Sequence, residues 1–248
     1  MRQTARDHSS DLPAHLQIGP WTRAFYFVAC SAAFVLLAAF AVKIESGPGL
    51  TWQSLLAIPA GIACADFVSG MVHWSADTWG SESMPVLGKR LLHPFRVHHV
   101  NPGDFLKRRF VDTNGDVAFL MILVLGAAWS MPMESPSQTF WAVFVLSLTA
   151  VGLMTNQIHQ WAHMRRAPWL VRMLQRTGVI LSYRAHRLHH QRPHTANYCI
   201  ATGWCNAPLQ AVQFFSVMEY LVSACTGLQP RSDEHAFTEA VSREGGDR

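Results

Sequence analysis

The chain has 248 residues, of which 15% are charged and 50% are hydrophobic. Soluble globular proteins carry about 25% charged residues, so this composition excludes a disordered chain, a coiled coil and a soluble helical bundle with a charged surface. The mean hydropathy of +0.11 is high for a soluble protein and low for a fully embedded one. We therefore expect part of the chain to lie in a bilayer. The net charge of +4 is not by itself a nucleic-acid signature, and no nucleic-acid partner is expected.

Four apolar stretches predict membrane-spanning helices. The first, residues 24–42, is long enough to cross the hydrocarbon core, which takes about 20 residues, and it contains no charge. It is too long for the apolar core of a signal peptide, so we expect a retained helix. The three further spans are predicted at 51–74, 117–133 and 139–157.

Two shorter segments, Trp169–Leu181 and Val212–Val222, combine apolar and charged residues and are expected to lie in the membrane interface. The second is apolar apart from Glu219. The predicted fold is an all-α integral membrane protein, in which four transmembrane helices carry a cytoplasmic histidine-rich helical cap and interfacial helices. The predicted divisions are an N-terminal segment, a single domain and a polar tail, at 1–23, 24–228 and 229–248.

The distribution of basic residues orients the predicted spans. With a cytoplasmic N-terminus, nineteen of the twenty Lys and Arg residues fall on the cytoplasmic side, and only Lys43 falls on the other. Cytoplasmic loops of membrane proteins are enriched in Lys and Arg. We therefore expect a cytoplasmic catalytic face, in a bacterial inner membrane or the endoplasmic reticulum. Four buried helices of a soluble protein would leave this asymmetry unexplained.

Ten of the thirteen histidines fall on the predicted cytoplasmic side, and the other three lie in the terminal segments. The pair His159 and His163 is spaced to share one helix face, and the HxxHH motif at 186–190 is expected to do the same. Adjacent residues on a helix diverge by about 100°, so His98 and His99 are suited to two neighbouring ions rather than one. The remaining members of the expected site are His73, which stands four residues before Asp77, and His194.

Imidazole side chains suit zinc, copper, iron and nickel. A closed structural zinc site needs only four ligands, so this many histidines fit two ions better than one. The chain has no Glu-x-x-His pair of the soluble di-iron bundles and no His-Glu-x-x-His motif of the zinc proteases. A metal transporter is disfavoured because the first, third and fourth spans contain almost no polar residues.

Two non-histidine residues are expected to support the catalytic site. Asp77 is the candidate partner that orients a ligand histidine, and Asn156, three residues before His159, is the candidate outer-shell or water-mediated ligand. No cysteine pair has metal-binding or disulfide spacing, so the five cysteines are not assigned to the site.

Five segments carry most of these candidate residues: Asp66–Ser81, Pro94–Pro102, Thr155–His163, His186–His194 and Tyr198–Trp204. They closely resemble the Kua-type lipid desaturase family, and the resemblance covers about residues 50–230. The resemblance implies a membrane phospholipid substrate, two histidine-bound iron ions, O₂ as oxidant and an external electron-transfer protein of the cytochrome b5 or ferredoxin type. The family histidines match, residue by residue, His73, His98, His99, His159, His163, His186, His189 and His190.

The family contains a branch that forms the vinyl-ether double bond of plasmalogens and a branch that desaturates acyl lipids. His194 and the sequence at 113–116 resemble the first branch. Ala185 departs from it, because another histidine often stands there, and His93 stands where an arginine is expected and is not counted as a ligand. Vinyl-ether formation from 1-O-alkyl phospholipid is therefore the expected function. An acyl-lipid desaturase or hydroxylase with the same metal centre stays open.

Overall fold

The computed structural model describes residues 17–232, 237–239 and 241–242. His8, His15 and His235, most of the predicted N-terminal segment and much of the predicted tail lie outside these residues. Within them every regular element is a helix, which confirms the predicted all-α class. The helices are α1 (Pro20–Glu45), α2 (Trp52–Thr78), η3 (Gly88–Leu92, a π-helix), α3 (His93–Val100), α4 (Pro102–Leu106), α5 (Phe110–Trp129), α6 (Pro136–His163), α7 (Trp169–Arg176), α8 (Tyr183–His189), α9 (Asn206–Ala211) and α10 (Phe214–Thr226).

Helices α1, α2, α5 and α6 are each long and apolar enough to cross a membrane, which confirms the four predicted spans. Three of them extend further toward the histidines than their apolar stretches indicated. α5 begins at Phe110 rather than at residue 117, because its polar first turns face protein and Asp112, Asn114 and Gly115 are buried. α2 and α6 likewise continue to Thr78 and His163. Hydropathy finds where a helix lies in lipid and misses the polar turns beyond it.

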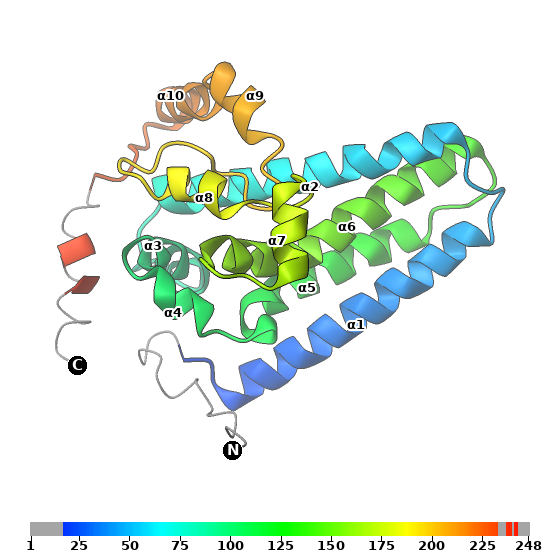
Figure 1. Cartoon of the computed structure of the whole chain (residues 1–248), viewed down its shortest axis with the longest axis horizontal. Helices are drawn as coiled ribbons and strands as arrows, with labels where there is room; N and C mark the ends of the chain where they lie inside the picture. The colour runs from blue at the N-terminus through cyan, green and yellow to red at the C-terminus, as the bar shows by residue number, and fades with distance from the viewer. Residues whose placement is uncertain (1–16, 233–236, 240, 243–248) are drawn as a thin grey trace.

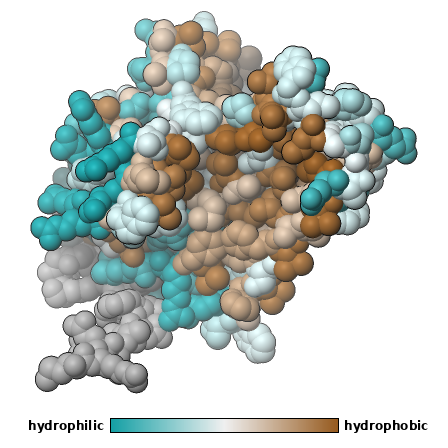
Figure 2. All heavy atoms as spheres, turned by 45° about the vertical axis from the view of Figure 1, so that its right-hand side comes forward, coloured by the Kyte–Doolittle hydropathy of each residue, from teal (hydrophilic) through white to brown (hydrophobic). Residues whose placement is uncertain are grey.

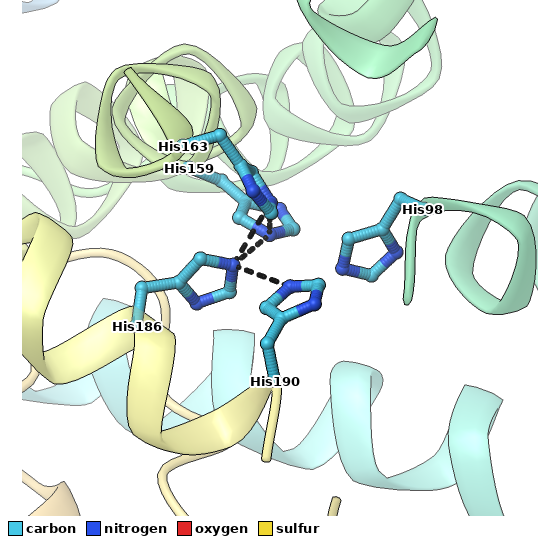
Figure 3. A group of neighbouring side chains, drawn as sticks. All are labelled: His98, His159, His163, His186 and His190. Atoms are coloured by element: carbon cyan, nitrogen blue, oxygen red, sulfur yellow. Dashed lines mark hydrogen bonds between the residues drawn. The ribbon is translucent and has the colours of Figure 1, made fainter. Parts of the chain in front are cut away.

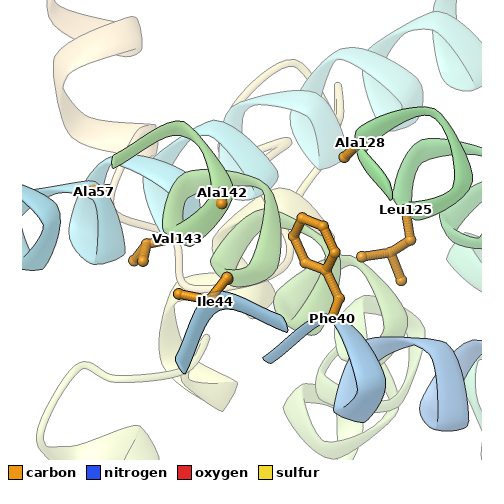
Figure 4. Packing of buried hydrophobic residues seen from close by; sticks show 7 residues of the cluster. All are labelled: Phe40, Ile44, Ala57, Leu125, Ala128, Ala142 and Val143. Atoms are coloured by element: carbon orange, nitrogen blue, oxygen red, sulfur yellow. The ribbon is translucent and has the colours of Figure 1, made fainter. Parts of the chain in front are cut away.

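The four spans pack side by side, with α2 against α6, α1 against α5, and α5 against α6 (Figure 1). One apolar cluster joins all four helices and is drawn in Figure 4: Phe40 and Ile44 of α1, Ala57 of α2, Leu125 and Ala128 of α5, Ala142 and Val143 of α6. At Gly61 of α2 a Cβ atom would lie 2.4 Å from the Phe144 carbonyl oxygen of α6. Small residues at such crossings let membrane helices approach closely.

The outer surface of the spans is apolar. Val35 of α1 is 70% exposed and Leu56 of α2 is 56% exposed, and Figure 2 shows hydrophobic side chains in a broad band over this part of the molecule. Hydrophilic side chains gather at the end that carries the short helices. An apolar surface of this extent needs a lipid environment, and the chain is therefore an integral membrane protein.

The two segments predicted to lie in the interface are both helical, with changed bounds. α7 ends at Arg176 rather than at Leu181, because Gly178 adopts the left-handed conformation (φ 72°) that ends a helix. α10 begins at Phe214, immediately after the left-handed Gln213, and ends before the left-handed Gly227. α7 exposes Trp169 and Leu170, as an interfacial helix requires.

Candidate metal centre

Five histidines from three separate segments converge on one point. Helix α6 presents His159 and His163 one turn apart, α8 and the residue after it present His186 and His190, and α3 presents His98. One ring nitrogen of each lies within 4.8 Å of the others. Figure 3 shows the rings of α6 and α8 directed toward one another, with His98 facing them from α3. We refer to these residues as the five-histidine group.

Four nitrogen atoms of the five-histidine group are spaced as ligands of one ion would be. His186 Nε2 lies 2.9 Å from His159 Nε2, 2.9 Å from His163 Nε2 and 3.0 Å from His190 Nε2. Imidazole nitrogens bind zinc at about 2.0–2.1 Å, so two of them at right angles around an ion would be about 3.0 Å apart.

A second cluster adjoins the first and consists of His73 and Asp77 of α2, His99 of α3 and His189 of α8. We refer to these residues as the mixed group. Asp77 Oδ2 is central, at 3.4 Å from His73 Nε2, 3.6 Å from His99 Nε2 and 3.5 Å from His189 Nε2. The rings of His73 and His98, one from each group, have centroids 5.6 Å apart.

The adjacent pair His98 and His99 is divided between the two groups, as the divergence of neighbouring helix residues predicted. The HxxHH motif behaves differently from the prediction that it shares one face. His186 and His190, one turn apart, join the five-histidine group, whereas His189 is turned to the mixed group. The two short helices α3 and α8 therefore each contribute to both groups.

His194 lies beside the mixed group without belonging to it. Its ring centroid is 4.6 Å from that of His99, and its backbone is left-handed with φ 60°. A non-glycine residue in this region is strained by about 1–2 kcal/mol, and such strain concentrates at functional sites. Its role as a ligand stays a prediction.

The environment of both groups suits a bound metal. Within the described residues the buried atoms His73 Nε2, His98 Nε2 and both Asp77 carboxylate oxygens have no hydrogen-bond partner. Buried polar atoms are rarely left unpaired, and these four point into a cluster of nitrogen and carboxylate donors. Nitrogen-rich donors of this kind fit first-row transition metals. The residues present therefore fit a metal pair.

Burial keeps the histidines of α3, α8 and the residue after α8 in the neutral form that binds metals. Removal from water, reinforced by neighbouring histidines, lowers the pKa of His98, His99 and His186 well below the usual value. The same causes lower the pKa of His190 to about 2. Because metal binding requires a free imidazole lone pair, these ligands need not release a proton at neutral pH.

Two backbone carbonyls orient rings of the mixed group. His73 Nδ1 lies 3.1 Å from the Tyr198 carbonyl oxygen, and His189 Nδ1 lies 2.8 Å from the Ala196 carbonyl oxygen. Each Nδ1–H donates to its carbonyl, which leaves Nε2 as the free lone pair. Sequence reasoning missed both partners, because a backbone acceptor leaves no signature in the residue pattern.

The segment that provides these carbonyls is anchored by Asp66, which is fully buried in α2. Asp66 Oδ1 accepts the backbone N–H groups of residues 201, 202 and 203, at 3.2, 2.7 and 2.9 Å, and Oδ2 accepts that of Cys205 at 3.0 Å. Its role is therefore structural.

Arg96 holds α3 against the end of α2 and was not recognised from the sequence. Its buried guanidinium donates to the carbonyl oxygens of Ala76, Trp79 and Gly80, at 3.1, 2.8 and 3.0 Å. Because His98 and His99 follow on the same short helix, this clamp fixes them relative to His73 and Asp77.

The remaining expected residues are placed as follows. Asn156 donates its side-chain amide to the Thr113 carbonyl at 2.6 Å, between α6 and α5, and its role as an outer-shell ligand stays a prediction. His93 lies outside both groups, and its Nδ1 is 3.1 Å from Glu82 Oε2. Asp77 was expected to orient a ligand histidine from outside the ligand cluster. Its carboxylate lies within the mixed group instead.

Comparison with known proteins agrees with the family resemblance seen in the sequence. A family model described as "Lipid desaturase domain" matches residues 62–233. Plasmanylethanolamine desaturase of Myxococcus xanthus is 46% identical over 184 residues, which are 74% of this chain and 66% of the relative, just under two thirds of its length. Plasmanylethanolamine desaturase 1 of mouse is 41% identical over 193 residues, 75% of this chain and 71% of the relative.

A plant relative is more distant. The chloroplastic fatty acid desaturase 4 of Arabidopsis thaliana is 32% identical over 218 residues, 86% of this chain and 65% of the relative. No solved structure matches the chain. The domain match covers α2 from residue 62 onward, all of α5 and α6, and every histidine of both groups. With the resemblance of the histidine motifs thus confirmed, the chain belongs to the lipid desaturase family.

Proposed function

We propose that this chain is an O₂-dependent, di-iron lipid desaturase that forms the vinyl-ether double bond of plasmalogens from 1-O-alkyl phospholipid. The observation that carries the proposal is the pair of adjoining ligand groups at one end of the spans. Two irons held there would supply the O₂ activation and hydrogen removal that no amino-acid side chain provides. Two relatives are named plasmanylethanolamine desaturase, which supports the ether substrate.

The net reaction removes one hydrogen from each of two neighbouring alkyl carbons. These two hydrogens, with two electrons and two protons supplied from outside, reduce O₂ to two water molecules. The chain's own residues position the reacting atoms. The carbonyls of Tyr198 and Ala196 keep a proton on Nδ1 of His73 and His189, and the buried setting of these rings excludes water.

The depth of the centre favours an ether substrate. His73 and Asp77 lie in the last two turns of α2, and His163 is the last residue of α6. The C1–C2 bond of an ether-linked alkyl chain lies beside the glycerol oxygen, directly beneath the headgroup. It reaches a centre at the span ends with little withdrawal of the lipid. A mid-chain double bond would need a bent tunnel to reach the same point.

The electron donor in this proposal is a soluble or membrane-bound protein of the cytochrome b5 or ferredoxin type, acting on the cytoplasmic face. The asymmetry of the Lys and Arg residues supports this face.

A single cysteine placed at Ser46 or Ser135, in the opposite loops, tests the orientation in a variant without other cysteines. It should react with an impermeant maleimide only from the non-cytoplasmic side. Labelling of either position from the cytoplasm would rule out the four-span orientation.

The function is tested by lipid profiling of a desaturase-deficient host supplied with 1-O-alkyl phospholipid. Cells that express the chain should accumulate 1-alkenyl phospholipid, which mild acid hydrolyses to an aldehyde. Cells with an empty vector provide the control. Absence of acid-released aldehyde from cells that contain the inserted, metal-loaded protein would contradict the proposal.

An acyl-lipid desaturase is the second candidate, favoured by the similarity to the plant fatty acid desaturase over 86% of the chain. The same host distinguishes the two, because an acyl desaturase would place the new double bond in ester-linked chains and release no aldehyde. Ala185 stands where the ether branch often has a histidine, so the lipid profile should be examined for both products.

A further inference from the structure

Helix α10 contains a single charged residue, Glu219, and turns it toward the protein. Its neighbours Val217, Tyr220 and Leu221 face outward with 49%, 72% and 45% exposure. Glu219 instead accepts the indole N–H of Trp74, at 3.0 Å, on Oε1. It is also the only acidic residue between positions 135 and 232. Glu219 is half-buried, and a lone ionisable residue on an otherwise apolar helix is a candidate for a functional site.

Glu219 lines a cavity of about 390 Å³ that opens on the candidate metal centre. Asp77 and His99 of the mixed group and His190 of the five-histidine group lie in its wall. Binding cavities for small ligands usually have about 300–1,000 Å³. The cavity therefore has room for a lipid headgroup and its glycerol backbone beside the metal centre.

Two arginines add positive charge to the wall of the cavity: Arg192, which follows α8, and Arg231, which follows α10. The Arg231 guanidinium lies over the Phe237 ring, 5.4 Å from its centroid, and its backbone N–H donates to the Thr78 carbonyl at 2.9 Å. A third arginine, Arg96, also lines the cavity. Its guanidinium donates hydrogen bonds to the carbonyl oxygens of residues 76, 79 and 80 and so has a structural role.

We propose that this cavity binds the phosphoethanolamine headgroup of the substrate, an inference that rests on the proposed function. Arg192 and Arg231 would bind the phosphate, since guanidinium groups suit phosphate oxygens. Glu219 would accept hydrogen bonds from the ammonium group. Only the glycerol backbone separates the phosphate from the ether carbon, so anchoring the headgroup here brings the C1–C2 bond to the metal centre.

The test measures binding and turnover separately. The purified full-length protein is titrated with short-chain diacyl phosphatidylethanolamine, diacyl phosphatidylcholine and diacylglycerol, none of which contains the reactive ether. The wild-type protein should bind phosphatidylethanolamine most tightly and diacylglycerol least. Glu219→Gln should weaken binding of phosphatidylethanolamine about tenfold and that of phosphatidylcholine less, because the trimethylated ammonium has no N–H to donate and loses only the attraction between charges.

Arg192→Gln and Arg231→Gln should weaken both phospholipids about tenfold without affecting diacylglycerol. The control variants are Glu45→Gln, at the end of α1 far from the cavity (Figure 1), and Arg187→Gln, exposed on α8 and outside the cavity wall. If a glutamine variant aggregates, the conservative Glu219→Asp and Arg231→Lys variants take its place, and they should retain part of the headgroup preference.

Equal binding of the three probes, or a preference that none of the variants changes, would overturn the headgroup site. The 1-O-alkyl forms then report on turnover, and Glu219→Gln should raise the KM for the ethanolamine lipid with a smaller change in kcat. Selective binding without any alkenyl product would contradict the proposed function and leave the headgroup site standing.

Discussion

Replacing His186 by alanine should abolish lipid desaturation and remove the metal from the five-histidine group, while the four spans stay inserted. The Nε2 atom of His186 lies within 3.0 Å of those of His159, His163 and His190, so its loss opens the centre of the group. Removing an outer-shell partner of a metal ligand already costs about 10–100-fold in activity, and loss of a central ligand should cost more. The measurements are desaturation rate and iron content of the purified variant.

His93→Ala is the matched control for this substitution. His93 begins the same short helix as His98 and His99, but its ring contacts Glu82 and lies outside both groups. It should keep the wild-type iron content and most of the activity. A His186→Ala variant with full iron content and full activity would show that the five-histidine group is not part of the metal centre.

Asp77→Ala should release the metal of the mixed group and leave that of the five-histidine group bound. The Asp77 carboxylate faces three histidine Nε2 atoms at 3.4–3.6 Å and has no hydrogen-bond partner among the described residues. As a direct ligand, it should be required for the second iron, so the variant should contain about half the wild-type iron and have no measurable activity.

The alternative for Asp77, suggested by the sequence, is an orienting partner of a ligand histidine. An orienting residue would lower activity about 10–100-fold while both irons stayed bound. Iron content therefore separates the two roles, and Asp77→Asn, which keeps the shape and removes the charge, provides the comparison. Wild-type iron content in Asp77→Ala would contradict direct ligation.

The sequence predicted those features that arise from local spacing. Apolar length identified the four spans, and helical periodicity placed His159 with His163 and His73 with Asp77. It also predicted that His98 and His99 would diverge, and the two residues lie in different ligand groups. These features could be predicted because the geometry of one helix decides them; that the groups bind two ions stays a prediction.

Features that depend on contacts between distant segments were not predictable in this way. The turn of His189 toward α2 depends on how α8 packs, and the Ala196 carbonyl that orients it belongs to a loop without a motif. The clamp of Arg96 on the end of α2 joins segments whose proximity the sequence does not encode locally. The polar first turns of α5 lie outside the apolar stretch predicted at 117–133, because they face protein rather than lipid.

The most direct test of a two-metal desaturase centre is the iron content of the purified wild-type chain. Protein isolated from iron-supplemented cells and analysed by inductively coupled plasma mass spectrometry should contain close to two irons per chain, one for each ligand group. Mössbauer spectra should show that the two irons are coupled, because the groups adjoin. A single iron per chain, or zinc in place of iron in an active preparation, would contradict the account.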